Sequence, residues 1–132
     1  MESSNEITYQ IIGAAYKIHR SLGPGLLESA YKECLYYLLV KEAVFVEKEK
    51  ALPLVFEEVK LEIGYRMDLF VENKIVVEIK AVEAFADVHM AQVLIYLKLS
   101  GCKIGLLLNF NVSDMKKGIK RIILRSVAIR DL

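Results

Sequence analysis

Two acidic side chains lie inside strongly apolar stretches of the chain. Asp68 lies in the stretch YRMDLFV and Glu78 in the stretch KIVVEIKAV, and both stretches have the β-branched and aromatic content of strands. Residues 72–74 between them form a polar connection that predicts a β-hairpin. With a three-residue loop, Val71 pairs with Ile75 and Asp68 comes directly opposite Glu78. A two-residue loop would shift the register by one and place the two carboxylates on different faces.

In the favoured register, the two carboxylates face each other across about 4.5–5.5 Å between Cβ atoms. Like charges at this separation destabilise a sheet unless a shared proton, a cation or a metal offsets them. Lys80 follows Glu78 by two residues on the same face and supplies one positive charge. One or two carboxylates, several waters and a substrate phosphate are the usual ligands of Mg²⁺. The alternative is a solvated ladder of Arg66, Asp68, Glu78 and Lys80 without chemistry.

Strict alternation of side chains predicts which hairpin residues share a face. In the first strand, one face holds Arg66, Asp68 and Phe70, and the other holds Tyr65, Met67, Leu69 and Val71. In the second strand, one face holds Val76, Glu78 and Lys80, and the other holds Ile75, Val77, Ile79 and Ala81. Both carboxylates and the lysine therefore belong to the same side of the sheet.

The remaining sequence must provide the elements that position this hairpin. Apolar residues at helical spacing predict a first helix, with a possible capping box at Ser3 and Glu6 and a stop at Gly23-Pro24-Gly25. The nearly all-apolar stretch 104–110 predicts a central strand buried on both faces. The full order is ααββββαββ, with helices at 7–22, 26–42 and 84–99 and strands at 44–52, 54–59, 65–71, 74–82, 104–110 and 119–124.

Composition bounds the class of protein. The 132 residues, residues 1–132, fit a single domain, and 55% of them are hydrophobic, with a net charge of +1. The apolar excess predicts a two-sided sheet, a homodimer interface, or both, and no apolar run approaches the roughly 20 residues of a membrane helix. A polar, acidic N-terminus without a signal pattern and two distant cysteines, Cys34 and Cys102, favour a cytoplasmic protein with reduced thiols.

The spacing of the hairpin residues resembles a known signature. Asp68, nine intervening residues and then Glu78-Ile79-Lys80 are similar to the D…ExK motif of the PD-(D/E)XK nuclease superfamily. Residues 25–31, GLLESAY, resemble the GxxExxY motif that names one family within it. Further similar segments are LGPG at 22–25, YRMDL at 65–69, VEIKAVE at 77–83, VHMAQVLIYLKLSG at 88–101 and LLLNF at 106–110. Met67 stands where the signature often has proline.

The resemblance implies an α/β fold with a restriction-endonuclease-like αβββαβ core, a mixed sheet flanked by helices, and here an extra N-terminal helix. It implies that Asp68 and Glu78 ligate Mg²⁺ or Mn²⁺, together with the backbone carbonyl of Ile79. Glu28 would reach the metal directly or through water. Lys80 would orient or deprotonate the attacking water, or stabilise charge on the phosphate oxygens.

The third helix offers further candidates, because His89, Gln92 and Tyr96 fall at i, i+3 and i+7 and share one side. Gln92-x-x-x-Tyr96 resembles the QxxxY motif of exonuclease-type members, in which the glutamine contacts the site and the tyrosine supports the nucleic-acid end. Alternatively, Gln92 caps the sheet edge and Tyr96 packs with a hydrated hydroxyl. His89 is a phosphate contact, a proton carrier, or a surface histidine near the helix start. Tyr31 is expected to position its helix rather than to do chemistry.

Three functions fit these residues. The first is a metal-dependent nuclease that hydrolyses phosphodiester bonds of DNA or RNA. The second is a catalytically silent nuclease-fold module that binds nucleic acid or a protein partner, or serves as a dimer. The third is a small-molecule phosphohydrolase with the same metal chemistry. Late basic residues offer at most a modest phosphate-binding strip: Lys116, Lys117, Lys120, Arg121, Arg125 and Arg130.

Overall fold

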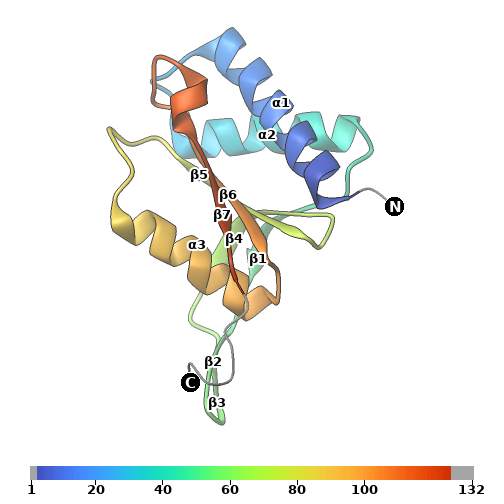
Figure 1. The fold of residues 1–132 in the computed structure, drawn as a ribbon, viewed down its shortest axis with the longest axis vertical. Coiled ribbons are helices and arrows are strands. Elements are labelled where there is room, and N and C mark those ends of the chain that lie inside the picture. The colour runs from blue at the N-terminus through green and yellow to red at the C-terminus, as the bar shows by residue number, and fades with distance from the viewer. Residues whose placement is uncertain (1–2, 126–132) are drawn as a thin grey trace.

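A mixed five-stranded sheet forms the centre of the computed structural model, which describes residues 3–125. The strand order is β1-β4-β5-β6-β7, with β5 and β6 parallel and the other neighbours antiparallel. Figure 1 shows helices on both faces of this sheet. The helices are α1 (Ser4–Leu22), α2 (Glu28–Lys41) and α3 (Asp87–Ser100), and the strands are β1 (Val46–Ala51), β4 (Arg66–Val71), β5 (Ile75–Lys80), β6 (Ile104–Asn109) and β7 (Ile119–Ile123).

The elements α2, β1, β4, β5, α3 and β6 form the expected αβββαβ core, with α1 in front of it. The predicted fold class is therefore confirmed. In the described residues 3–125, no helix has the length and apolar character needed to cross a membrane.

The two faces of the sheet are covered by different helices. Leu106 and Leu108 of β6 belong to the core cluster that contains residues of α1 and α2, whereas Leu107 belongs to the cluster that contains residues of α3. The prediction of a strand buried on both faces is therefore correct for β6. Gly105 allows α3 to approach, because a Cβ at this position would lie 2.6 Å from Cγ1 of Val93.

The connection between α1 and α2 is fixed by Tyr31. Its hydroxyl donates to the Gly23 carbonyl at 2.6 Å and accepts from the Leu26 N–H at 3.1 Å. Its ring stacks on Phe110 with 4.4 Å between centroids. Gly23 ends α1 with a φ of 68°, as the glycine turn predicts. Tyr31 thus determines where α2 begins, and with it the position of Glu28, the first residue of that helix.

The expected strand at 54–59 is wrong. The chain reverses at Glu57, which has a φ of 53°, and forms a separate hairpin of β2 (Leu54–Phe56) and β3 (Val59–Leu61). Figure 1 shows this hairpin projecting beyond the end of the main sheet. Val55 and Phe56 are 56% and 66% exposed, so β-forming composition here does not reflect burial in the sheet.

The predicted alternation in β4 also fails at one residue. Met67 packs in the cluster on the α3 side, although Leu69 and Val71 pack on the opposite side. The interruption falls at Asp68, which lies between Met67 and Leu69. In β1, Glu49 lies between the residues that pair with Leu69 and Met67, and its φ is 53°. A left-handed residue in one strand disturbs the pleat of its neighbour, so strict alternation does not hold here.

Candidate functional site

The β4–β5 hairpin has the three-residue connection that the sequence favours. Val71 pairs with Ile75, and Asn73 in the loop adopts a φ of 55°. Asparagine tolerates this left-handed conformation, so the local sequence suits the turn. The pairing of β4 with β5 ends at Leu69 and Val77, and the next residues along the two strands are Asp68 and Glu78.

Each carboxylate is bonded to the backbone of the opposite strand. The Asp68 N–H donates to Oε2 of Glu78 at 2.7 Å, and the Ile79 N–H donates to Oδ2 of Asp68 at 2.8 Å. The backbone N–H groups of Asp68 and Ile79 thus donate to carboxylates rather than to carbonyl groups of the partner strand. Glu78 is 3% exposed and Asp68 is partly buried, so both carboxylates are held in a largely dehydrated place.

Burial raises the pKa of both acids. The pKa of Glu78 rises to about 8, through desolvation first and the charge of Asp68 second. Desolvation also raises the pKa of Asp68, while the hydrogen bond from Ile79 opposes that rise. Without a cation, two such carboxylates favour retaining a proton near neutral pH. The pair is therefore an electrostatically unsatisfied site that a positive ion would relieve.

Two lysines act on this pair. Lys80, the last residue of β5, lowers the pKa of both Asp68 and Glu78. Lys32 of α2 has the same effect on both acids. Lys32 was not predicted from the sequence, although its position four residues after Glu28 places the two on one side of the helix.

Glu28 reaches the site from the first turn of α2. Its Oε2 accepts a hydrogen bond from the Ala81 N–H at 3.1 Å, directly after Lys80. Its charge also raises the pKa of Asp68. Glu28 therefore lies beside the end of β5, and its charge acts on Asp68.

Asn109 is a second residue of the site that was not predicted from the sequence. It is 2% exposed, and its side chain accepts from the Val82 N–H at 3.1 Å and donates to the Val82 carbonyl at 2.8 Å. Phe110 N–H donates to the Lys80 carbonyl at 3.0 Å. Asn109 and Glu28 thus fix the chain immediately after Lys80. The available signal was a single polar residue near the end of the apolar stretch 104–110.

Tyr96 and Gln92 of α3 lie on the site side of the helix. Tyr96 is 4% exposed, and its pKa rises to about 12 because of burial first and then the charges of Glu78 and Asp68. A hydrogen bond with the Gln92 side chain opposes this shift. The Tyr96 hydroxyl therefore lies in the field of the carboxylate pair, with Gln92 beside it.

His89 has a structural partner in its own helix. Its Nδ1 accepts a hydrogen bond from the Ala86 N–H at 2.9 Å, at the start of α3. Its ring meets Phe85 edge-on with 6.3 Å between centroids. Of the alternatives open for this residue, the geometry favours a histidine that caps the helix start.

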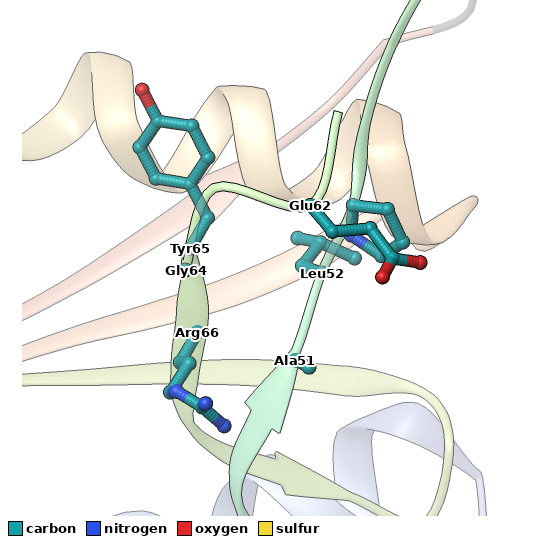
Figure 2. Close-up of a pocket in the computed structure, with 7 residues that line it drawn as sticks. Ala51, Leu52, Glu62, Gly64, Tyr65 and Arg66 are labelled. Atoms are coloured by element: carbon teal, nitrogen blue, oxygen red, sulfur yellow. The ribbon is translucent and has the colours of Figure 1, made fainter. Parts of the chain in front are cut away.

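A pocket of about 270 Å³ opens beside the start of β4. Figure 2 shows Tyr65 and Arg66 on β4's side of this pocket and Glu62 on the preceding segment. The charge of Tyr65 also contributes to the raised pKa of Tyr96. Its lining residues are Ala51, Leu52, Pro53, Glu62, Gly64, Tyr65 and Arg66.

The late basic residues do not all face this site. Arg121 donates to Asn5 Oδ1 at 2.8 Å and to the Thr8 hydroxyl at 3.3 Å, both on α1. Arg130 lies outside the described residues.

The donor set of the site suits a hard divalent cation. Within residues 3–125, no group of three or more His, Cys, Asp or Glu side chains is placed to hold a metal ion. Two buried carboxylates of like charge nevertheless provide the oxygen ligands that Mg²⁺ and Mn²⁺ prefer. The elevated pKa of Glu78 is the feature that such an ion would reverse.

Comparison with known proteins agrees with this geometry. The family model described as the PD-(D/E)XK nuclease superfamily matches residues 5–122, which includes all the site residues named above. No curated protein and no solved structure matches the chain. Because this match covers most of its length, the chain belongs to the PD-(D/E)XK nuclease superfamily.

Proposed function

We propose that the chain is a divalent-metal-dependent phosphodiesterase that hydrolyses phosphodiester bonds of DNA or RNA. The observation that supports this most is the pair of buried Glu78 and partly buried Asp68, whose carboxylates are each bonded to the backbone of the opposite strand. Such an arrangement is costly in an apolar sheet unless a proton or a cation offsets the charge, and a bound metal ion is one such cation. Superfamily membership agrees with a nuclease-like function.

Asp68, Glu78 and the carbonyl of Ile79 would hold Mg²⁺ or Mn²⁺, with Glu28 joining directly or through water. When bound, such an ion polarises a phosphate and lowers the pKa of a coordinated water. Side chains of the protein would orient the attacking water and contact the substrate. Because backbone groups of β4 and β5 fix the carboxylates, the ligands need little reorganisation when the ion arrives.

Lys80 would orient the attacking water or stabilise charge on the phosphate oxygens, and the anchored segment after it keeps its backbone in place. Gln92 and Tyr96 would contact the substrate beside the scissile group, and His89 would act by fixing the start of α3. The pocket at Tyr65 is large enough for part of a nucleotide.

We also propose membership of the GxxExxY family within the superfamily. The support is residues 25–31 and the role of Tyr31 in fixing the helix start that presents Glu28. Cys34 and Cys102 are free thiols, which suits the proposed cytoplasmic location. The exposed apolar residues of the β2–β3 hairpin agree with a homodimer or another protein contact.

The test is cleavage of labelled single-stranded and duplex DNA and RNA with Mg²⁺ or Mn²⁺. We expect metal-dependent cleavage by the unmodified chain and its loss in Asp68→Asn. Asp87→Asn, at an exposed acid on α3, is the matched control and should cleave normally. Absence of cleavage on every substrate, or full activity in Asp68→Asn, would refute the proposal. Hydrolysis of free nucleotides alone would instead favour a small-molecule phosphohydrolase.

A second candidate is a silent nuclease-fold module that binds nucleic acid or a protein partner. Its support is the β2–β3 hairpin, where Val55, Phe56 and Val59 are each more than half exposed. Calorimetry with Mn²⁺ separates the two, because a binding module has no need to hold a cation between Asp68 and Glu78. An absence of heat of binding would favour this candidate.

A further inference from the structure

A groove runs along the surface between α1 and α2, the two helices that cover one face of the sheet (Figure 1). Two adjoining cavities of about 380 and 260 Å³ form it, and Lys17 and Leu38 line both of them. Leu22 and Glu33 line the first cavity, and Gln10 and Glu42 line the second. At a rise of 1.5 Å per residue, the groove follows α1 from residue 10 to residue 22, over about 18 Å.

The groove is apolar at its base and at its edge. Ile18 and Leu39 belong to the buried core beneath it, and Leu38 packs against that core. Leu22 and Tyr37 line the first cavity with 48% and 61% of their surface exposed. Large apolar side chains that stay exposed beside an apolar hollow mark a contact with another macromolecule.

The charged residues that line the groove are divided between the helices. Lys17 comes from α1, whereas Glu33 comes from α2 and Glu42 caps the end of α2. Oε1 of Glu33 already lies 2.7 Å from Nζ of Lys48 on β1. Lys17 and Glu42 are exposed and line the same cavity, yet neither forms an ion pair with any residue in the range 3–125. One cation and one anion of the groove are therefore available to an external partner.

We propose that this groove is the contact surface of a homodimer, and that its occupant is the α1–α2 surface of a second copy of the chain. In a two-fold symmetric contact, a residue that meets a second residue across the interface is met by that residue in return. Lys17 of each copy then pairs with Glu42 of the other, so a single arrangement neutralises all four charges. A second copy necessarily carries these matching charges, whereas an unrelated helix would carry them only by chance.

Apolar side chains of the same surface complete the contact. Tyr37 and Leu22 project beside a hollow, and in the dimer each would enter the hollow of the other copy. Exposed aromatic anchors that fill a pocket of the partner dominate the binding energy of many interfaces. The surface is thus complementary to itself both in shape and in charge.

This contact does not depend on the proposed function. The residues that line the groove belong to α1, α2 and the residue after α2, and the Asp68–Glu78 pair is not among them. A monomeric chain that cleaves nucleic acid would refute the dimer and leave the proposed function standing. The β2–β3 hairpin is the competing surface, because it also exposes apolar residues.

The first experiment measures the dissociation constant of the dimer by sedimentation equilibrium of the full chain. We expect Lys17→Glu and Glu42→Lys each to raise it about tenfold or more, because each reversal creates two like-charge contacts in one dimer. Lys98→Glu, at an exposed position of α3, is the matched charge reversal, and Phe56→Ser alters the competing hairpin. Both controls should associate as the unmodified chain does. Because Lys17 and Glu42 are exposed, Tm of their variants, measured at a concentration where all chains are monomeric, should be unchanged.

The second experiment mixes Lys17→Glu and Glu42→Lys in equal amounts. Each chain of one variant then meets the opposite charges of the other, so the mixture should form a heterodimer with about the affinity of the unmodified chain. A pairing of Lys17 with Glu42 inside one chain would leave the mixture as weakly associated as either variant alone. The proposal is overturned by that result, by an unmodified chain that is monomeric at every concentration, by reversals without effect, or by a dimer that Phe56→Ser dissociates.

Discussion

In the Asp68–Glu78 pair, each carboxylate accepts a hydrogen bond from a backbone N–H of the strand that holds the other acid. The Asp68 N–H donates to Glu78 Oε2 at 2.7 Å, and Asp68 Oδ2 accepts from the Ile79 N–H at 2.8 Å. Each carboxylate therefore takes its orientation from a backbone group, which is more rigid than a side-chain partner. Both carboxylates are thus oriented by the backbone of the hairpin.

The stability of the metal-free protein should fall as the pH rises from 4.5 towards 8. In this interval the folded protein holds more protons than the unfolded chain, because the pKa of Glu78 rises from 4.5 to about 8 on folding. We expect a loss on the order of 3 kcal/mol in the free energy of unfolding, measured by urea denaturation at several pH values. Glu78→Gln should flatten this dependence and Glu47→Gln should not. A flat profile in the unmodified chain would show that Glu78 ionises normally.

Lys80→Met should abolish cleavage without abolishing metal binding. The substitution removes a positive charge beside the carboxylates but none of the proposed ligands, so we expect kcat to fall by about 100-fold or more. Mn²⁺ affinity, measured by calorimetry, should be unchanged or higher. Lys98→Met, at an exposed position of α3, is the control. Loss of metal binding together with activity would show that Lys80 acts on the fold of the site instead.

Tyr96→Phe should lower cleavage while leaving the fold intact. The ring stays in the core, but the hydroxyl that lies in the field of Glu78 and Asp68 is removed. We expect about a tenfold decrease in kcat/KM and little change in Tm. Tyr37→Phe, at a tyrosine that is 61% exposed on α2, should match the unmodified chain in both measurements. A large fall in Tm without an effect on catalysis would show that the Tyr96 hydroxyl serves the packing of the core and not the reaction.

Tyr31→Phe should destabilise the protein through the loop before α2. It removes the hydrogen bonds to Gly23 and from Leu26 but keeps the stack on Phe110. We expect a loss of about 1–2 kcal/mol in the free energy of unfolding, measured by urea denaturation. Tyr9→Phe, at a residue that is 80% exposed, should change stability little. Equal stability of Tyr31→Phe and the unmodified chain would exclude this role of the motif tyrosine.

The central pair could be predicted from the sequence because a hairpin register follows from loop length. Once Val71 pairs with Ile75, counting along the two strands predicts Asp68 next to Glu78, just beyond the last pair of the two strands, Leu69 and Val77. The two-sided burial of β6 followed in the same way from an apolar stretch of strand length. These properties depend on local sequence and on the period of the strand, and both are visible in one chain.

The features that escaped prediction depend on contacts between distant segments. Lys32 and Glu49 meet only because α2 packs against β1, and no local pattern encodes that contact. Met67 changes side because the neighbouring strand is distorted at Glu49, which strict alternation ignores. The exposed hairpin after Pro53 has the composition of a buried strand, so composition alone assigned it wrongly.

The most direct measurement is the anomalous scattering of manganese in a crystal of the unmodified chain soaked with MnCl₂. We predict one strong peak within about 2.0–2.6 Å of a carboxylate oxygen of both Asp68 and Glu78, and its loss in Asp68→Asn. A peak elsewhere, or no peak beside the two carboxylates at a saturating concentration of manganese, would contradict the assignment of this pair as the metal site.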